Sequence, residues 1–215
     1  SNLFRQVLRR NKINPDCIQL VNNTDRSYVD YLLFSMKSYI DVIIPRGGKS
    51  LVSKVLKLST VPVIGHLEGL CHLYIDENAD LKMAKKITLN AKLRRTSICG
   101  AAETLLVHKK ILKTHLVPIL ELLEKNNCKI IGDKTVKKYF KNTILAKEND
   151  WKKEYLDSII SVKIVNTIEE AITHIKKYGT NHTESIVTDN KKNADKFLKE
   201  ITSSIVMHNT STQFA

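Results

Sequence analysis

Short runs of β-branched and aliphatic residues alternate with helix-patterned segments along most of this chain, and this order constrains its fold more than any other feature. In the N-terminal third the expected strands are 17–21, 41–45, 61–64 and 71–76, and the expected helices are 25–36 and 49–59. Strands that alternate with helices in this way predict an α/β fold, in which parallel strands are joined by helical crossovers.

The alternation continues to the end of the chain. Asp80 opens a helix over residues 81–95 that places Met83, Ile87 and Ala91 on one side and lysines on the other. Further helices are expected over 111–125, kinked at Pro118, and over 167–179 and 189–201. Further strands are expected over 104–108, 128–131, 159–165, 185–188 and 203–209. Residues 133–155 are polar and show no clear pattern, so no element is predicted there.

Composition narrows the class of protein and of partner. With 42% hydrophobic residues among 215, the chain can bury a sizeable core. Its formal charge of +13 suits an anionic partner such as a nucleotide, an acyl phosphate, a nucleic acid or an acidic membrane surface. Aromatic residues make up only 6% of the chain and are not interleaved with basic ones, which argues against nucleic-acid binding. Charge alone does not choose among the other partners.

The cysteines and the apolar runs indicate the compartment. Cys17, Cys71, Cys99 and Cys128 are spread without a C-x-x-C pair, which favours reduced thiols over a disulfide framework or a structural zinc site. No run approaches the roughly 18 apolar residues that span a bilayer, and the N-terminus lacks the apolar centre of a signal peptide. We therefore expect a cytoplasmic protein with no membrane or metal partner.

The stretch IIPRGGKS contains the second half of a phosphate-binding loop, from Gly48 to Ser50. The first glycine of that motif would fall at position 43, which is Ile43, so the motif fails. Gly47 and Gly48 still allow a tight turn between a strand and a helix. Two interpretations stay open, a plain strand-to-helix turn and a turn that brings a helix N-terminus to a phosphate.

Cys99 is the candidate nucleophile. A free cysteine is more often a small buried apolar residue than a reactive one. Cys99 is nevertheless expected at a turn next to Gly100, where backbone amides can approach a ligand. It also follows a helix that ends in the basic residues Lys92, Arg94 and Arg95, whose positive field would favour the thiolate. The core and the nucleophile interpretations both remain open on these residues alone.

Longer stretches carry a family resemblance. They are IDVIIPRGGKSLV, VPVIGHLEGLCHLYID, NAKLRRTSICGAAETLLVH, EYLDSIISVKIVNTIEEAITHIKKYGTNHTESIVT and NTSTQFA. Together, and over essentially the whole chain, they resemble gamma-glutamyl phosphate reductase, also called glutamate-5-semialdehyde dehydrogenase, a branch of the aldehyde dehydrogenase superfamily. The resemblance implies an aldehyde-dehydrogenase-like α/β fold, with a partial Rossmann-type cofactor-binding domain followed by an α/β catalytic domain.

The resemblance also implies a reaction. Members of this family reduce gamma-glutamyl phosphate to glutamate 5-semialdehyde with NADPH in proline biosynthesis, through a thioester on a cysteine. Hydrolytic aldehyde dehydrogenases carry a glutamate base at the head of the segment that matches HLEG. This sequence has His66 there, which suits a reaction that does not activate water.

Residue roles follow from the same resemblance. The cysteine of the family pattern R-x-S-x-C-x-x-x-E-T-L-L-V falls on Cys99, which is then the nucleophile, and amides near Gly100 would hold the substrate oxygen. Glu154 resembles the carboxylate that holds the nicotinamide ribose. The other implied contacts are Pro45, Arg46, Gly47 and Gly48 for the cofactor, and Asn209, Ser211 and Thr212 for the substrate tail.

The family pattern extends beyond both ends of this sequence, so the chain looks like a truncated member. Residues 1–68 correspond to a partial cofactor-binding domain, 69–208 to the catalytic domain and 209–215 to the start of a substrate and cofactor loop. Such a chain is expected to be inactive alone, and its unpaired sheet edges should make it a homo-oligomer. The alternative is an inactive relative that acts as a binding or assembly module.

Overall fold

A computed structural model describes residues 2–214, and the chain divides into two compact units between Leu67 and Glu68. The sequence places this boundary one residue later and predicts a separate segment over 209–215, of which the described residues 209–214 belong to the second unit. None of the helices that residues 2–214 form has the length and apolar composition that a membrane span requires.

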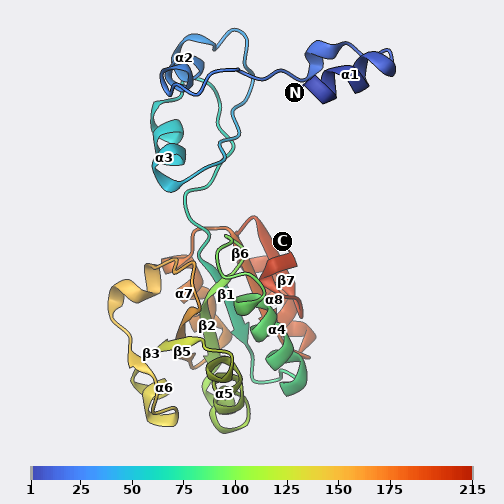
Figure 1. The fold of residues 1–215 in the computed structure, drawn as a ribbon. Helices are drawn as coiled ribbons and strands as arrows, with labels where there is room; N and C mark the ends of the chain where they lie inside the picture. The colour runs from blue at the N-terminus through green and yellow to red at the C-terminus, as the bar shows by residue number, and fades with distance from the viewer. Residues whose placement is uncertain (1, 215) are drawn as a thin grey trace. The chain divides into compact units, whose positions relative to one another are not determined.

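The first unit contains helices but no strand among its described residues. Its elements are α1 (Asn2–Arg10), η1 (Pro15–Cys17), α2 (Ser27–Ser35) and α3 (Lys49–Leu58) (Figure 1). Leu33 of α2 is buried together with Val52 and Val55 of α3. The helices predicted over 25–36 and 49–59 are therefore confirmed.

The strands predicted over 17–21, 41–45 and 61–64 are wrong. Residues 18–21 form no ladder, and the other two segments meet only at one parallel bridge, between Ile43 and Val63. A β-branched run becomes a strand only when a neighbouring strand pairs with it, and propensity alone does not supply that neighbour.

The second unit is built on one parallel sheet of seven strands, in the order β4-β3-β5-β2-β1-β6-β7 (Figure 1). The strands are β1 (Cys71–Ile75), β2 (Ala102–His108), β3 (Lys129–Gly132), β4 (Ile144–Leu145), β5 (Ile159–Val165), β6 (Thr183–Val187) and β7 (Ile205–His208). The predicted α/β fold with parallel strands is confirmed for this unit.

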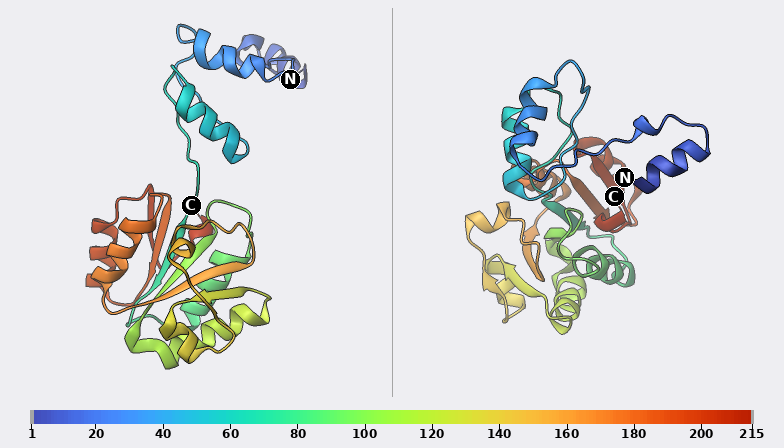
Figure 2. Two further views of the ribbon diagram at one scale, coloured as in Figure 1. Left: turned by 90° about the vertical axis from the view of Figure 1, so that its left-hand side faces the viewer. Right: turned by 45° about the horizontal axis from the view of Figure 1, so that its top comes forward.

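Helices cover both faces of the sheet (Figure 2). They are α4 (Leu81–Leu93), α5 (Val117–Lys125), α6 (Lys134–Tyr139), α7 (Ile168–Tyr178) and α8 (Lys191–Glu200). Successive strand residues point to opposite faces, so Leu105 packs in the core beneath α4 and α5 whereas Leu106 packs in the core beneath α7 and α8. The sheet therefore has a buried apolar core on each of its two faces.

Local sequence explains the helix ends. Asp80 precedes α4 and its side chain accepts a hydrogen bond from the backbone N–H of Met83 at 2.7 Å, as a helix-capping residue does. Of the helix predicted over 111–125, the part from Val117 is the α-helix α5, with Pro118 in its first turn. The 3₁₀ turn η2 (Lys109–Ile111) and the π-helix η3 (Leu112–Leu116) precede it. The unassigned stretch 133–155 contains α6, β4 and η4 (Glu148–Lys152).

Candidate functional site

Cys99 lies in the turn that joins α4 to β2. The backbone N–H of Ala101 donates to the carbonyl of Ile98 at 3.0 Å, which places Cys99 and Gly100 at the two corners of the turn. The Cys99 side chain is half-buried. The turn predicted from the sequence is therefore present, and it leaves the sulfur partly accessible.

Two glycines allow other segments to approach this turn closely. A side chain at Gly69 would place its first carbon 2.3 Å from the Cys99 carbonyl oxygen, and one at Gly100 would lie 3.1 Å from the carbonyl oxygen of Thr212. Only glycine leaves room for the first of these contacts. Gly69 and the segment around Thr212 thus form two walls of the site.

Cys71 and His182 lie beside Cys99, and the sequence did not single out His182. The Cys71 thiol donates to the Cys99 carbonyl oxygen at 3.0 Å, and its sulfur lies 3.5 Å from Nδ1 of His182. A ring nitrogen of His182 lies within 4.8 Å of the Cys99 sulfur. His182 immediately precedes β6 and Cys99 shortly precedes β2, so the parallel sheet brings them to the same edge. The position of both residues just before the amino ends of parallel strands is the sequence feature that could have predicted His182.

The remaining cysteines are poorer candidates for a nucleophile. Burial raises the pKa of the Cys128 thiol to about 12 and raises the pKa of the Cys71 thiol still further. Cys17 is exposed, but it lies in the first unit at the end of η1. Cys99 alone among the four combines partial access with a nearby imidazole.

The basic end of α4 differs from the sequence expectation. Lys92 does not lie on a solvated helix face, because its side chain is fully buried and its Nζ lies 2.6 Å from Oε2 of Glu103. Its charge is therefore matched by a carboxylate and does not act freely on Cys99. Arg94 is exposed and its guanidinium lies 5.1 Å from the centre of the Phe214 ring. The prediction that Lys92 contributes a free positive field is wrong.

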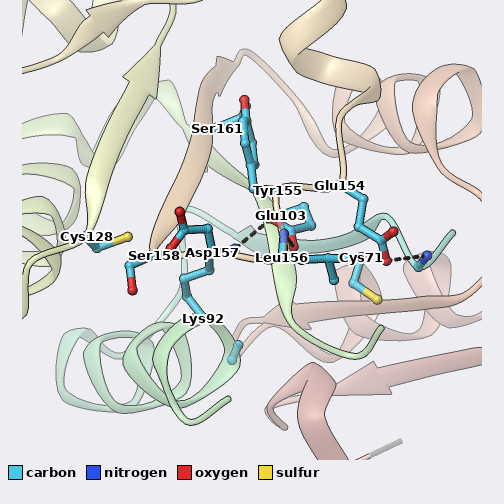
Figure 3. A network of polar contacts seen from close by, with 12 residues as sticks. Cys71, Lys92, Glu103, Cys128, Glu154, Tyr155, Leu156, Asp157, Ser158 and Ser161 are labelled. Atoms are coloured by element: carbon cyan, nitrogen blue, oxygen red, sulfur yellow. Dashed lines mark hydrogen bonds and ion pairs between the residues drawn. The ribbon is translucent and has the colours of Figure 1, made fainter. Parts of the chain in front are cut away.

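Glu154 reaches the same site from the long segment before β5. One of its carboxylate oxygens accepts a hydrogen bond from the backbone N–H of Gly69 at 2.8 Å (Figure 3). Its other oxygen accepts no hydrogen bond from the residues that the structure describes, and the side chain is half-buried. Glu154 therefore keeps one acceptor that a hydroxyl group can use.

The segment after β7 forms a shaped loop. Asn209 has a φ of 53°, and its side chain accepts from the backbone N–H of Thr188 at 3.0 Å and donates to the Thr188 carbonyl at 3.2 Å. Ser211 and Thr212 are buried. An open groove of about 330 Å³ runs beside the loop, lined by Lys86, Ile87, Asn90, Asn209, Thr210, Ser211 and Phe214. Asn209 is thus engaged in holding the loop, and Ser211 lies both in the loop and at the groove.

The glycine turn of the first unit leads directly into α3. Gly48 is the residue before the helix and supplies no side-chain bond to its first turn. Pro45 and Arg46 lie in the connection between Ile43, at the single bridge, and this turn. The turn is present, and whether a phosphate occupies it remains a prediction.

A scan against protein-family models finds no match for this chain. A gamma-glutamyl phosphate reductase from Parvibaculum lavamentivorans is 53% identical over 198 residues, which are 92% of this chain and 47% of that protein. The crystal structure of a gamma-glutamyl phosphate reductase from Thermotoga maritima superimposes with a TM-score of 0.92 at 43% identity, over 98% of this chain and 50% of that one.

The chain is a homologue of gamma-glutamyl phosphate reductases. It spans about half the length of the relatives it matches. A propionaldehyde dehydrogenase from Rhodopseudomonas palustris matches with a TM-score of 0.70 at 15% identity, over 97% of this chain and 54% of that one, which shows a shared fold. The expected aldehyde-dehydrogenase-like fold is thus supported over half of such a structure.

Glu103 belongs to the stretch around Cys99 that resembles the reductases. Glu103 follows the cysteine by four positions, and the resemblance assigned it no role. It is buried against Lys92 and also accepts a hydrogen bond from the backbone N–H of Leu156 at 3.2 Å. Glu103 is therefore buried behind the Cys99 turn and has no exposed surface.

Proposed function

We propose that the second unit carries the acyl-transfer step of a gamma-glutamyl phosphate reductase, with Cys99 as the nucleophile. The observation that carries this proposal is the position of Cys99, half-buried at a glycine-walled turn with a His182 nitrogen within 4.8 Å of its sulfur. A nucleophilic cysteine needs partial access and a base or positive field nearby.

In the proposed reaction the Cys99 thiolate attacks the acyl carbon of gamma-glutamyl phosphate. A sulfur–carbon bond forms, the bond from that carbon to the phosphate oxygen breaks, and phosphate leaves with the electron pair. His182, which has a ring nitrogen within 4.8 Å of the Cys99 sulfur, would accept the thiol proton before the attack. Backbone amides at Cys99 and Gly100 would donate to the carbonyl oxygen as its negative charge develops.

NADPH, when bound, supplies the hydride that reduces the thioester to glutamate 5-semialdehyde. The residues fit such a group at two places. Glu154 retains one free carboxylate oxygen for a ribose hydroxyl, and the turn of Pro45, Arg46, Gly47 and Gly48 leads into a helix whose first turn has no side-chain cap. We propose these five residues as the cofactor contacts of this chain.

The groove beside the loop after β7 is the proposed place for the amino-acid end of the substrate. Lys86 offers a cation there, and Asn209 and Ser211 border the same space. The buried Thr212 holds the loop against Gly100, so that the tail site and the nucleophile stay in register. We propose that this reaction takes place in the cytoplasm and belongs to proline biosynthesis.

Acylation of the chain by a small acyl phosphate tests the proposal. Incubation with acetyl phosphate should give a hydroxylamine-sensitive acetyl thioester on Cys99, detected by mass spectrometry of proteolytic peptides. C99S should abolish the adduct, whereas C17S, the matched change in the first unit, should leave it unchanged. An adduct on Cys17, or no thioester at any cysteine, would contradict the proposal.

The complete reaction is measured separately, as NADP⁺ reduction with pyrroline-5-carboxylate and phosphate. Turnover that C99S abolishes would support both acyl transfer and hydride transfer. Acylation without turnover, the outcome predicted from the sequence, would support the acyl-transfer step alone.

A further inference from the structure

A buried ion pair stands behind the Cys99 turn. Lys92 Nζ lies 2.6 Å from Glu103 Oε2, and neither side chain has any exposed surface. Burial raises the pKa of the Glu103 carboxyl, and the charge of Lys92 counters that effect. Removing two charges from water costs about as much as their attraction returns, so such a pair is weak evidence for stability. Stability alone therefore does not account for the Lys92–Glu103 ion pair.

The pair closes the loop that carries the nucleophile. Lys92 lies in the last turn of α4 and Glu103 is the second residue of β2, so the ion pair ties together the two ends of the segment containing Cys99. Movement of either end would move the turn. The turn itself has one internal backbone bond, from Ala101 to Ile98, and the Cys71 thiol donates to its Cys99 carbonyl. The ion pair adds a tie between the two ends of the segment.

The second oxygen of Glu103 holds a different segment. Its Oε1 accepts from the backbone N–H of Leu156 at 3.2 Å, and Leu156 has a φ of 52°, a conformation that favours glycine. Two residues earlier, Glu154 accepts from the N–H of Gly69 at 2.8 Å. Figure 3 shows Lys92, Glu103, Leu156 and Glu154 following one another across the site.

These contacts form a closed ring that begins and ends at the Cys99 turn. Glu103 ties the Cys99 loop to the segment of Leu156 and Glu154, and Glu154 ties that segment to Gly69. Gly69 in turn packs against the Cys99 carbonyl, where a single added carbon would lie 2.3 Å from the oxygen. One carboxylate thus fixes both the turn that carries the sulfur and the segment that carries the ribose-binding candidate.

We propose that Lys92 and Glu103 are positioning residues, whose ion pair sets the Cys99 turn and the Glu154 segment relative to each other. Neither residue touches the substrate. The inference rests on the proposed function, because a positioned Cys99 matters only if Cys99 is the nucleophile. Its test uses neither substrate nor cofactor, so its result is independent of the acylation and turnover assays.

Two double variants separate positioning from stability. K92M/E103M replaces the pair by apolar side chains of similar length, and K92M/E103Q removes both charges but keeps an oxygen that can accept from Leu156. Hydrogen exchange of the Gly69 and Leu156 amides, and the rate and pH profile of Cys99 alkylation by iodoacetamide, are measured on both. K177M, which removes an exposed pair with Glu148, is the control.

We expect K92M/E103M to keep its thermal midpoint within a few degrees, yet to exchange both amides at least tenfold faster and to shift the midpoint of the alkylation pH profile. K92M/E103Q should restore exchange of the Leu156 amide to within about threefold of the unchanged chain, because it keeps an acceptor for that amide. Its alkylation profile should stay shifted, because the ion pair is absent, and K177M should alter neither measurement. If K92M/E103M folds and keeps the original exchange rates and pH profile, the proposal is wrong.

A measurement on the unchanged chain covers the case in which K92M/E103M does not fold. If one ring of contacts holds both segments, the Gly69 and Leu156 amides should open together, with exchange rates that agree within about threefold and respond equally to denaturant. Independent opening of the two amides would overturn the proposal without any variant.

Discussion

The two units of this chain have similar sequence patterns and very different structures. In the second unit the apolar runs pair into a seven-stranded sheet, and residues such as Leu105 have no exposed surface. In the first unit the corresponding runs form only the single bridge between Ile43 and Val63, and Leu20 and Ile64 are 66% and 64% exposed. The difference teaches that an apolar pattern stabilises a strand only through neighbours that bury it.

Truncation of an apolar side chain should give the largest difference between the two units in the free energy of unfolding. L105A should lower the free energy of unfolding by about 2–5 kcal/mol, because it removes a fully buried side chain and leaves a cavity. L20A should change it by less than about 0.5 kcal/mol, since that side chain is already in water. Denaturant titrations followed through the fluorescence of Trp151, a buried reporter in the second unit, measure L105A. Titrations followed by far-ultraviolet circular dichroism, to which the helices of both units contribute, measure L20A. Equal costs at the two sites would remove the contrast between the units.

Acid should act on the second unit through His174. Burial lowers the pKa of His174 to about 2, helped by the neighbouring charges of His72 and Lys163, while in the unfolded chain the group titrates near 6.5. Below pH 6.5 the unfolded state therefore binds a proton that the folded state does not. The free energy of unfolding falls as the pH is lowered through this range.

The expected loss is about 2 kcal/mol between pH 6.5 and 5. H174N keeps an acceptor near the Lys163 ammonium, which lies 3.1 Å from Nδ1, but does not titrate in this range. Its unfolding free energy should therefore be flatter over this window, as measured by denaturant titration at each pH. Parallel pH curves for the two proteins would show that His174 is not responsible.

Thiol reactivity should reverse the order of exposure between the units. Cys17 of the first unit is exposed and Cys99 is half-buried, so access alone favours Cys17. We expect Cys99 to react with iodoacetamide about tenfold faster at neutral pH, because His182 can take up its proton. Peptide mapping after limited labelling decides the order. Preferential labelling of Cys17 or Cys128 would mean that access and not activation governs these thiols.

Self-association should be the smallest effect and should originate in the first unit. Its exposed apolar side chains, such as Leu20 and Ile64, favour contact with a second copy. Sedimentation equilibrium at micromolar concentration should therefore give a mass above that of one chain, and L20K/I64K should lower it. L198K, a matched change at an exposed leucine of α8, should leave the mass unchanged. A monomer at all concentrations would contradict the predicted homo-oligomer.

Local patterns predicted the elements that local contacts decide. Asp80 predicted the start of α4 because a capping side chain bonds to an amide three residues away. The alternating order of strands and helices predicted the parallel sheet of the second unit. The stretch 133–155 gave no pattern, although Asp133 caps α6 locally by accepting from the backbone N–H of Val136 at 2.9 Å. The η4 segment also depends on a distant partner, since the Tyr178 hydroxyl donates to Glu148 at 2.6 Å.

The sequence by itself determined that this chain is an α/β protein and that Cys99 is its candidate nucleophile, because a helix pattern, a turn and a glycine are readable from neighbours along the chain. Only the tertiary structure decided that His182 accompanies Cys99, that Lys92 is buried against Glu103, and that the first unit forms no strand among its described residues. The sequence separation between Cys99 and His182 carries no local signal. Which charges are buried and which strands are paired depends on surfaces that the fold alone brings together.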